Sequence, residues 1–269
     1  MGELDGKVAI VTGAGRRRSI GNSTAHALAK LGADLVLTGT GRDPSTFPPD
    51  EQEVGWRDIE STADEVRALG RRALTIVGDV TDEAHVDTMI ERVLEEYGRI
   101  DILVNNAAYR YGPDRVPLIE VTPDIFQKVI DVKVRGTFLC SKAVAKVMIE
   151  QGQGGKIVTI ASAAGKRASA ATLAYNAANF AQVGMTHSMA LDLGPHGINV
   201  NAVCPGLVDT SRLDPLGRGE VWQERASLAP IGRAGTPQEV AGLIAFLCTE
   251  AASWIHGQAI NIGGGTVMD

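Results

Sequence analysis

Short runs of apolar, often β-branched residues alternate along the chain with longer segments whose apolar residues recur every three or four positions. The apolar runs predict buried strands, and the longer spacing predicts helices that pack on a sheet. Strands are expected at residues 7–12, 34–39, 73–77, 102–104, 156–160, 198–203 and 259–262. Helices are expected at residues 20–31, 59–69, 83–97, 122–150, 173–193 and 237–248. The alternation predicts an α/β fold in which one domain, residues 1–269, carries a parallel sheet covered on both faces.

Composition and charge narrow the class of protein. The net charge of −6 argues against a general nucleic-acid binder. The chain contains no apolar run of about 18 residues and no basic-then-apolar start, so we expect no membrane span, no secretory signal and a cytoplasmic location. The three cysteines, Cys140, Cys204 and Cys248, are odd in number and widely spaced. This pattern favours buried free thiols over disulfides or a metal site.

A glycine-containing turn joins the first predicted strand to the first predicted helix. Residues 12–21 read Thr-Gly-Ala-Gly-Arg-Arg-Arg-Ser-Ile-Gly. Glycine in such a turn lets the backbone approach a pyrophosphate, which is then held at the positive N-terminus of the helix. The position of the turn, after a strand and before a helix in the first βαβ unit, predicts a bound dinucleotide.

Three polar residues follow the fifth predicted strand at a characteristic spacing. Tyr175 and Asn179 share one face of their helix, and Ser162 stands thirteen residues before Tyr175. Together with the Asn-Asn-Ala-Ala segment at 105–108 and Pro-Gly at 205–206, they resemble the motifs of the short-chain dehydrogenase/reductase family. The resemblance runs from residue 6 to residue 263. It implies a Rossmann-type, doubly wound parallel sheet with the strand order 3-2-1-4-5-6-7.

Two positions depart from the family pattern. The family has Lys four residues after the Tyr, where this chain has Asn179, and it usually has Asn where this chain has Lys133. We interpret this as a reciprocal exchange within one catalytic site. In that interpretation Ser162 polarises the substrate oxygen, Tyr175 moves the proton, Lys133 supplies the positive field and Asn179 anchors ribose or water. The alternatives are an inactive or knocked-out enzyme, and Lys133 as an ordinary surface residue.

The cofactor type follows from the end of the second predicted strand. Family members that prefer NAD usually carry an acid there, on the ribose 2′-hydroxyl, and this chain has Gly39. Arg42 and the arginines at 16–18 offer cations for a 2′-phosphate. NADP(H) is therefore the expected cofactor, and NAD(H) stays possible because of Asp43. The resemblance assigns cofactor contacts to Gly13, Arg16, Arg18, Ser19, Ile20, Gly21, Thr40, Arg42, Asp79, Val80, Asn106, Ala107, Ala108, Tyr175, Asn179, Pro205, Gly206, Val208 and Thr210.

Two long connections interrupt the alternation of strands and helices. Residues 41–58 are rich in Pro, Asp and Glu, and they are either a solvated insertion or a flap near the adenosine end of the cofactor or an oligomer contact. Residues 211–235 correspond to the mobile lid that covers the substrate in the family. Tyr109 and Tyr111 either line the entrance of the substrate site or are exposed loop aromatics.

These features predict an NADP(H)-dependent oxidoreductase that interconverts a small ketone or aldehyde and an alcohol, with Tyr175 as general acid and base. Two other functions remain open: reduction of C=N or activated C=C bonds, and a dinucleotide-binding sensor with impaired catalysis. The resemblance also implies a homo-oligomer, a dimer or a tetramer. We expect no metal, no nucleic acid and no membrane among the partners.

Overall fold

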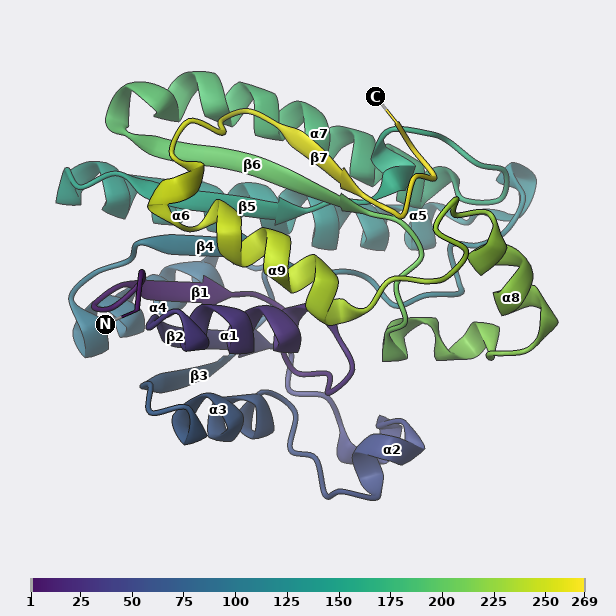
Figure 1. Cartoon of the computed structure of the whole chain (residues 1–269), viewed down its shortest axis with the longest axis horizontal. Coiled ribbons are helices and arrows are strands. Elements are labelled where there is room, and N and C mark those ends of the chain that lie inside the picture. Colours follow the sequence, from purple (N-terminus) through teal and green to yellow (C-terminus); the bar gives the residue numbers. More distant parts are fainter. Residues whose placement is uncertain (1, 269) are drawn as a thin grey trace.

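The computed structural model describes residues 2–268, which form a parallel sheet of seven strands between two layers of helices (Figure 1). The strand order is β3-β2-β1-β4-β5-β6-β7, so the expected Rossmann-type topology is confirmed. The strands are β1 (Val8–Val11), β2 (Asp34–Gly39), β3 (Ala73–Val77), β4 (Ile102–Asn105), β5 (Gly155–Ile160), β6 (Ile198–Pro205) and β7 (Ala259–Ile262).

The central strand β1 shows why the apolar runs become buried strands. All four of its residues are buried, between β2 on one side and β4 on the other. Because side chains alternate along a strand, Val8 and Ile10 join one apolar cluster, and Ala9 and Val11 join another. The sheet therefore buries both of its faces, which requires strands that are apolar at nearly every position.

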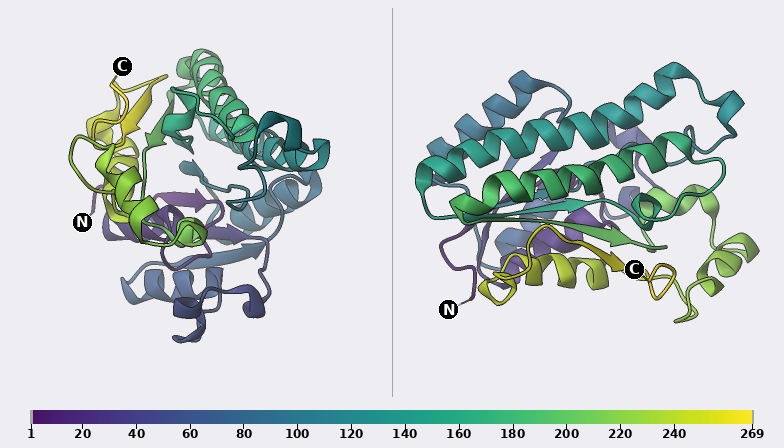
Figure 2. Two further views of the ribbon diagram at one scale, coloured as in Figure 1. Left: turned by 90° about the vertical axis from the view of Figure 1, so that its right-hand side faces the viewer. Right: turned by 90° about the horizontal axis from the view of Figure 1, so that it is seen from above.

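The two faces of the sheet are covered by different sets of helices (Figure 2). One set is α1 (Ile20–Lys30), α3 (Ile59–Ala68) and α9 (Pro237–Leu247). The other set is α4 (Glu83–Tyr97), α6 (Gly136–Gln151) and α7 (Leu173–Leu193), with α5 (Pro123–Ile130) packed on α7. Within residues 2–268, none of the helices has the length and apolar character that crossing a membrane requires.

The helical segment expected over residues 122–150 runs from Pro123 to Gln151, but it is not α-helical throughout. It begins as predicted, since the Thr122 hydroxyl accepts a hydrogen bond from the N–H of Ile125 and Pro123 lies in the first turn. Between α5 and α6, residues Asp131–Arg135 form a π-helical turn. A π turn holds one more residue than an α turn and so disturbs the regular backbone hydrogen bonds. Periodicity did not reveal it because apolar residues continue on both sides.

The insertion at residues 41–58 has structure of its own. It contains a short 3-10 turn at Pro44–Thr46 and the one-turn helix α2 (Pro49–Gln52). The indole N–H of Trp56 donates to the carbonyl of Gly15 at 2.6 Å, so the insertion packs back on the glycine-containing turn after β1. Its Glu51 is fully buried. The segment therefore lies against the predicted adenosine end of the cofactor site.

Candidate active site

The candidate site lies at the edge of the sheet where the parallel strands end, which is the edge at the right of Figure 1 and facing the viewer in the left panel of Figure 2. Ligands of open α/β sheets bind outside the carboxyl ends of the strands. The structure brings the predicted residues to this edge from different strands. They are Thr40 after β2, Asp79 and Val80 after β3, Asn106, Ala107 and Ala108 after β4, Ser162 after β5, and Pro205, Gly206, Val208 and Thr210 at and after the end of β6.

The turn after β1 is held by the segment after β4. The Asn106 side chain donates to the carbonyls of Thr12 at 2.8 Å and Gly13 at 2.9 Å. Gly13 has a φ of +68°, and a Cβ there would lie 2.9 Å from the Cα of Ala107. A side chain at Gly21 would likewise collide with the Asn106 amide, at 2.6 Å. These contacts explain the glycines at both positions by the close approach of two loops.

Helix α1 begins directly after this turn. Ser19 caps it, because its hydroxyl accepts from the N–H of Asn22 at 3.1 Å and donates to the carbonyl of Arg16 at 2.7 Å. The first-turn N–H groups of Ile20 and Gly21 have no helical carbonyl partners. The positive end of α1 therefore adjoins the turn, and this arrangement fits the pyrophosphate of a dinucleotide.

The adenosine end of the site is richer in carboxylates than the sequence suggested. Arg42 donates to Asp58 at 2.9 Å and to the buried Glu51 at 3.1 Å, and both acids come from the insertion. Asp58 also lies near Gly39, since a Cβ there would be 3.7 Å from one of its oxygens. Asp43, in contrast, accepts from the N–H of Ser45 within its own turn. The acid that adjoins the end of β2 is thus Asp58, nineteen positions further along the chain than Gly39.

The other arginines of the glycine-containing turn differ in their partners. Arg18 forms ion pairs with Asp50 at 3.0 Å and with Asp214 of the predicted lid at 2.7 Å. Arg17 donates to the backbone carbonyl of Asp50. Arg16 forms no ion pair with any carboxylate of residues 2–268, and burial together with the charge of Arg42 lowers its pKa. Arg16 is therefore a partly buried guanidinium that can bind an anion, although Glu51 and Asp58 partly balance its charge.

The catalytic residues expected from the sequence meet around the Tyr175 ring. Ser162 follows the end of β5, where its hydroxyl accepts from the N–H of Ala164 at 3.1 Å, and it contributes to lowering the pKa of the nearby Tyr175. Lys133 is 3% exposed, and its Nζ lies 5.7 Å from the centroid of the Tyr175 ring. The Lys133 ammonium donates to the carbonyl of Ile160, the last residue of β5, at 3.2 Å. The π turn thus carries Lys133 into the site rather than to the surface.

Burial and charge bring two pKa values close together. Burial raises the pKa of the Tyr175 hydroxyl, but Arg212, Lys133 and the hydrogen bond with Ser162 lower it by more, to about 8. Burial lowers the pKa of the Lys133 ammonium to about 8, against the opposing attraction of Tyr175. A phenol and an amine that titrate near neutrality are suited to proton transfer.

Asn179 is fully buried and bonded to its own helix. Its side-chain nitrogen donates to the carbonyl of Tyr175 at 2.7 Å. Gly165, in the turn after Ser162, lies so close that a Cβ there would be 2.7 Å from the Asn179 carbonyl oxygen. The Asn179 side-chain oxygen is a buried acceptor with no hydrogen-bond partner among residues 2–268. A buried water molecule would satisfy it, whereas a fully buried atom offers no surface to a cofactor, which argues against the predicted contact of Asn179 with ribose.

Two arginines that the sequence did not single out complete the group around Tyr175. The guanidinium carbon of Arg115 lies 3.9 Å from the centroid of the Tyr175 ring, and that of Arg212 lies 5.4 Å away. Arg115 also lies over the ring of Tyr111, at 5.1 Å, and Arg212 donates to the carbonyl of Tyr109 at 3.0 Å. Arg115 stands in an irregular segment and Arg212 in the short 3-10 helix Ser211–Leu216, and neither segment has a periodicity that indicates which way a side chain points.

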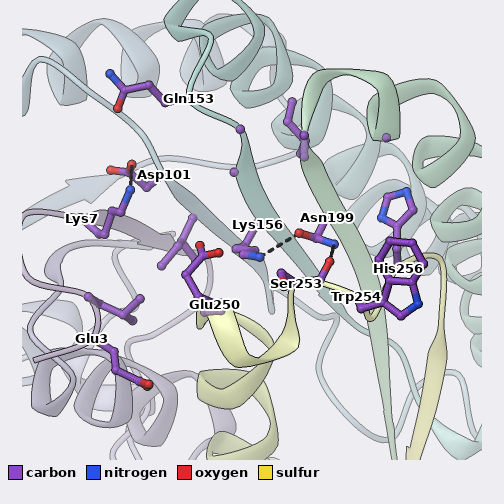
Figure 3. A pocket seen from close by; sticks show the side chains of 18 residues that line it. Glu3, Lys7, Asp101, Gln153, Lys156, Asn199, Glu250, Ser253, Trp254 and His256 are labelled. Carbon is purple, nitrogen blue, oxygen red and sulfur yellow. Dashed lines mark hydrogen bonds and ion pairs between the residues drawn. The ribbon is translucent and has the colours of Figure 1, made fainter.

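A separate cavity of about 660 Å³ lies at the opposite edge of the sheet, where β4, β5 and β6 begin (Figure 3). Figure 3 shows a hydrogen bond from Lys156 to Asn199 and an ion pair between Lys7 and Asp101 on the walls of this cavity. None of the predicted site residues lines it. Within residues 2–268, no group of three or more His, Cys, Asp or Glu side chains is arranged to hold a metal ion.

The sheet is of the Rossmann type, and it brings a glycine-containing turn, a serine and a partly buried tyrosine together at its carboxyl edge. These features define a class of dinucleotide-binding proteins, and comparison with known proteins identifies the family within that class. A family model described as "Enoyl-(Acyl carrier protein) reductase" matches residues 13–267. Sorbitol dehydrogenase of Cereibacter sphaeroides is 36% identical over 275 residues, which cover 98% of this chain and 99% of that protein. Galactitol 2-dehydrogenase of Agrobacterium fabrum has the same identity and the same coverage. The chain belongs to the short-chain dehydrogenase/reductase family.

Solved structures agree with this placement. The crystal structure of a putative gluconate dehydrogenase from Agrobacterium tumefaciens is similar with a TM-score of 0.86 at 33% sequence identity, over 98% of each chain. A short-chain type dehydrogenase/reductase from Mycobacterium marinum gives a TM-score of 0.85, also at 33% identity, over 99% of this chain and 97% of that chain. The family uses nicotinamide dinucleotides in general and acts on small molecules.

Proposed function

We propose that the protein is an NADP(H)-dependent oxidoreductase that interconverts a ketone or aldehyde and the corresponding alcohol. The observation that carries the proposal is the buried Lys133, whose Nζ lies 5.7 Å from the Tyr175 ring, beside Ser162 at the carboxyl edge of the sheet. Positive charge around the ring lowers the pKa of the Tyr175 hydroxyl to about 8. When bound, the nicotinamide supplies or accepts the hydride. In reduction, the Ser162 hydroxyl donates to the substrate oxygen and polarises it, and Tyr175 gives that oxygen its proton. In alcohol oxidation the Tyr175 phenolate takes the proton back.

In this proposal the family's lysine and asparagine have exchanged positions. Lys133 takes the role of the lysine that the family has at position 179, and Asn179 stands in place of that lysine. The buried Lys133 ammonium, 5.7 Å from the Tyr175 ring, stabilises the phenolate. Asn179 carries no charge, but its fully buried side-chain oxygen can accept a hydrogen bond from an internal water molecule. The burial of Lys133 supports the exchange, because a surface role would leave the ammonium in water.

The preference for NADP(H) rests on Arg16. Its guanidinium is partly buried beside Arg42 and has no carboxylate partner among residues 2–268, so a 2′-phosphate would supply the missing anion. Asp58 opposes this preference, because a carboxylate beside Gly39 repels a 2′-phosphate. NADPH should bind at least several-fold more tightly than NADH, and Asp58→Asn should widen the difference. Equal or reversed dissociation constants in the unmodified protein would overturn the preference.

We also propose a cytoplasmic location for the enzyme. Cys140, Cys204 and Cys248 are buried and free of disulfides, which suits the reducing cytoplasm. We propose a homo-oligomer as well, since the family is usually oligomeric.

A spectrophotometric screen tests the function directly. NADPH oxidation is followed with neutral ketones, diketones, oxo acids, cyclic imines and activated alkenes. Turnover of carbonyl compounds, reduced at least ~100-fold in Tyr175→Phe while cofactor affinity is retained, is the expected result. Turnover of imines or alkenes alone would replace the proposal by reduction of C=N or C=C bonds. Cofactor binding without turnover of any compound would indicate a sensor.

A further inference from the structure

Two guanidinium groups lie against the tyrosine that moves the proton. Arg115, in the connection after β4, is 3.9 Å from the centroid of the Tyr175 ring, and Arg212, in the connection after β6, is 5.4 Å away. Lys133 adds a third cation at 5.7 Å. Three segments that are far apart in the sequence therefore bring positive charge to one ring at the carboxyl edge of the sheet.

These charges are poorly compensated by the protein itself. Within the described chain, Arg212 forms no ion pair with a carboxylate, and its Nε donates to the carbonyl of Tyr109. Arg115 has one acidic neighbour, Asp114, whose oxygen lies 3.5 Å from the Arg115 Nε. Neither of those two atoms has a hydrogen-bond partner, so the pair lacks hydrogen-bond geometry. Burial and the charge of Arg212 lower the pKa of Arg115, which shows that the two arginines repel each other.

Arg212 and Lys133 are the cations that contribute most to lowering the pKa of the Tyr175 hydroxyl. Arg115 contributes less than either, so proton transfer by Tyr175 does not explain why Arg115 lies on the ring. Stacking of a guanidinium on an aromatic ring is a weak attraction, which does not offset the crowding of like charges in a partly buried place. Moreover, Tyr175 is neutral when it acts as the proton donor, and then Arg212 has no anionic partner among residues 2–268. The arrangement lacks one negative group.

We propose that the substrate supplies this group, and that Arg115 and Arg212 bind a carboxylate on the carbonyl or alcohol compound that Tyr175 protonates or deprotonates. The substrate class is a hydroxy acid and its oxo acid. This inference rests on the proposed function. The planar guanidinium is well matched to a carboxylate, which it can hold by two parallel hydrogen bonds. Such a clamp places the reacting carbon beside the Tyr175 hydroxyl and discriminates against neutral ketones.

Arg212 has a second possible partner, the pyrophosphate of the cofactor, because its charge also acts on Arg16. Arg115 adjoins Tyr111 and Tyr175 instead. The roles of the two arginines can therefore be distinguished by experiment. A loss of cofactor affinity in Arg212→Gln, with an unchanged preference for acids over amides, would assign Arg212 to the cofactor and overturn its role in the clamp.

The first measurement compares matched substrates that differ in charge alone. The probes are 3-oxobutanoate against 3-oxobutanamide and 2-oxopentanoate against 2-oxopentanamide, each with NADPH. We expect kcat/KM to favour the acids, and the ratio of acid to amide to fall about tenfold to 100-fold in Arg115→Gln, the scale of one charge-assisted hydrogen bond. Arg115→Lys should recover part of the ratio. Arg110→Ala removes an exposed arginine from the same connection and should leave the ratio unchanged.

A second measurement does not depend on turnover. Binding of pentanoate and of pentanamide to the complex of the enzyme with NADP⁺ is measured by calorimetry, for the unmodified protein and for Arg115→Gln. Tighter binding of the carboxylate, lost in Arg115→Gln, supports the inference even if the chemistry proves different. Turnover of neutral ketones at rates equal to those of the acids would overturn the inference and leave the proposed function standing. If a folded Arg115→Gln retains the full preference for the carboxylate, the inference fails as well.

Discussion

At the scale of single residues, the protonation of Lys133 and Tyr175 makes the reaction rate depend on pH. Each has a pKa of about 8, so the two groups titrate as a pair rather than independently. Alcohol oxidation needs the phenolate beside the ammonium, so it should increase as Tyr175 loses its proton and decrease once Lys133 is neutral, with a maximum near pH 8. Carbonyl reduction needs the neutral phenol and should decrease as the pH rises through about 8. Initial rates in both directions from pH 6 to pH 10 test this.

The dependence of the oxidation rate on pH also shows which cation lowers the pKa of Tyr175. Removal of the ammonium in Lys133→Asn takes away one of the groups that lower the pKa of Tyr175, so the residual oxidation activity should require a more alkaline pH. An unchanged midpoint in this variant would show that Arg212 and Arg115 set the tyrosine pKa without Lys133.

The exchange between positions 133 and 179 predicts a rescue. Lys133→Asn leaves two asparagines and no ammonium, and turnover should be nearly abolished. Lys133→Asn combined with Asn179→Lys restores the usual family arrangement and should recover a measurable part of the loss. Asn179→Lys alone places two ammonium groups together, and their repulsion should impair the site. Steady-state kinetics of the four proteins gives the coupling between the two positions.

A control separates this effect from a general change of charge. Lys128 is exposed on α5, where it pairs with Asp124 one turn away. Lys128→Asn should leave turnover intact. A fully active Lys133→Asn variant would contradict the exchange and leave Lys133 without a role in proton transfer.

Residue spacing predicted the part of the site that lies on regular elements. Ser162, Tyr175 and Asn179 stand at a strand end and on one helix face, where spacing determines direction. Arg115 and Arg212 were not predicted, because Arg115 stands in an irregular connection and Arg212 in a short 3-10 helix of the predicted lid. Asp58 was missed for a related reason: its place beside Gly39 depends on how the insertion folds back, and its backbone φ of 54° is uncommon for a residue other than glycine.

At the scale of elements, the π turn Asp131–Arg135 is held in place by the neighbouring helix α7. Gln182 donates to the Lys133 carbonyl at 3.0 Å and to the Thr137 hydroxyl at 3.0 Å. The amide thus partners a carbonyl in the segment where the α-helical hydrogen bonds are disturbed. A buried carbonyl left without a partner costs about 1–3 kcal/mol.

Replacement of Gln182 should therefore affect both stability and chemistry. In Gln182→Met we expect the free energy of unfolding to fall by about 1–3 kcal/mol, measured by urea denaturation. Turnover should fall too, because the turn that carries Lys133 loses its anchor. His187→Met changes an exposed residue further along α7 and should alter neither quantity. Normal stability and normal turnover in Gln182→Met would show that the π turn persists without this amide.

The fold was more predictable than the details of its elements. The seven strands and the main helices follow from apolar runs and helical spacing because the sheet is buried on both faces. The π turn and α2 were not predicted. The first lies inside an uninterrupted helical pattern, and the second is a one-turn helix whose stability comes from packing rather than periodicity.

At the scale of the whole molecule, α6 and α7 lie side by side on the outside of one helical layer and expose apolar side chains (Figure 2). Leu173, Phe180 and Leu191 are 42%, 46% and 82% exposed, and their spacings of seven and eleven residues put them on one stripe of α7. Phe138 and Ile149 form a similar stripe on α6. Such a surface is typical of an interface between protein subunits.

We expect these stripes to form the contact between two copies of the chain. Phe180→Glu places a charge in the contact and should shift the protein toward monomers, as measured by sedimentation velocity at several concentrations. Leu69→Glu introduces the same charge at an exposed apolar position at the end of α3, in the other helical layer, and should leave assembly unchanged. An unmodified protein that is monomeric at micromolar concentration would contradict the expectation.

The inward direction of Lys133 has a historical consequence. If the ancestor carried the usual family residues, Asn at 133 and Lys at 179, two substitutions were needed, and they could not occur in either order with equal cost. Loss of the lysine at 179 first leaves a lineage with no ammonium beside the tyrosine. Gain of Lys133 first leaves two amines whose repulsion impairs the site, but one of them can stay neutral while the other serves the phenolate, so part of the activity is kept. If the ancestor had the same π turn, position 133 already faced the ring and the backbone needed no change. Ancestral sequences on this branch should therefore carry lysine at both positions before asparagine appears at 179.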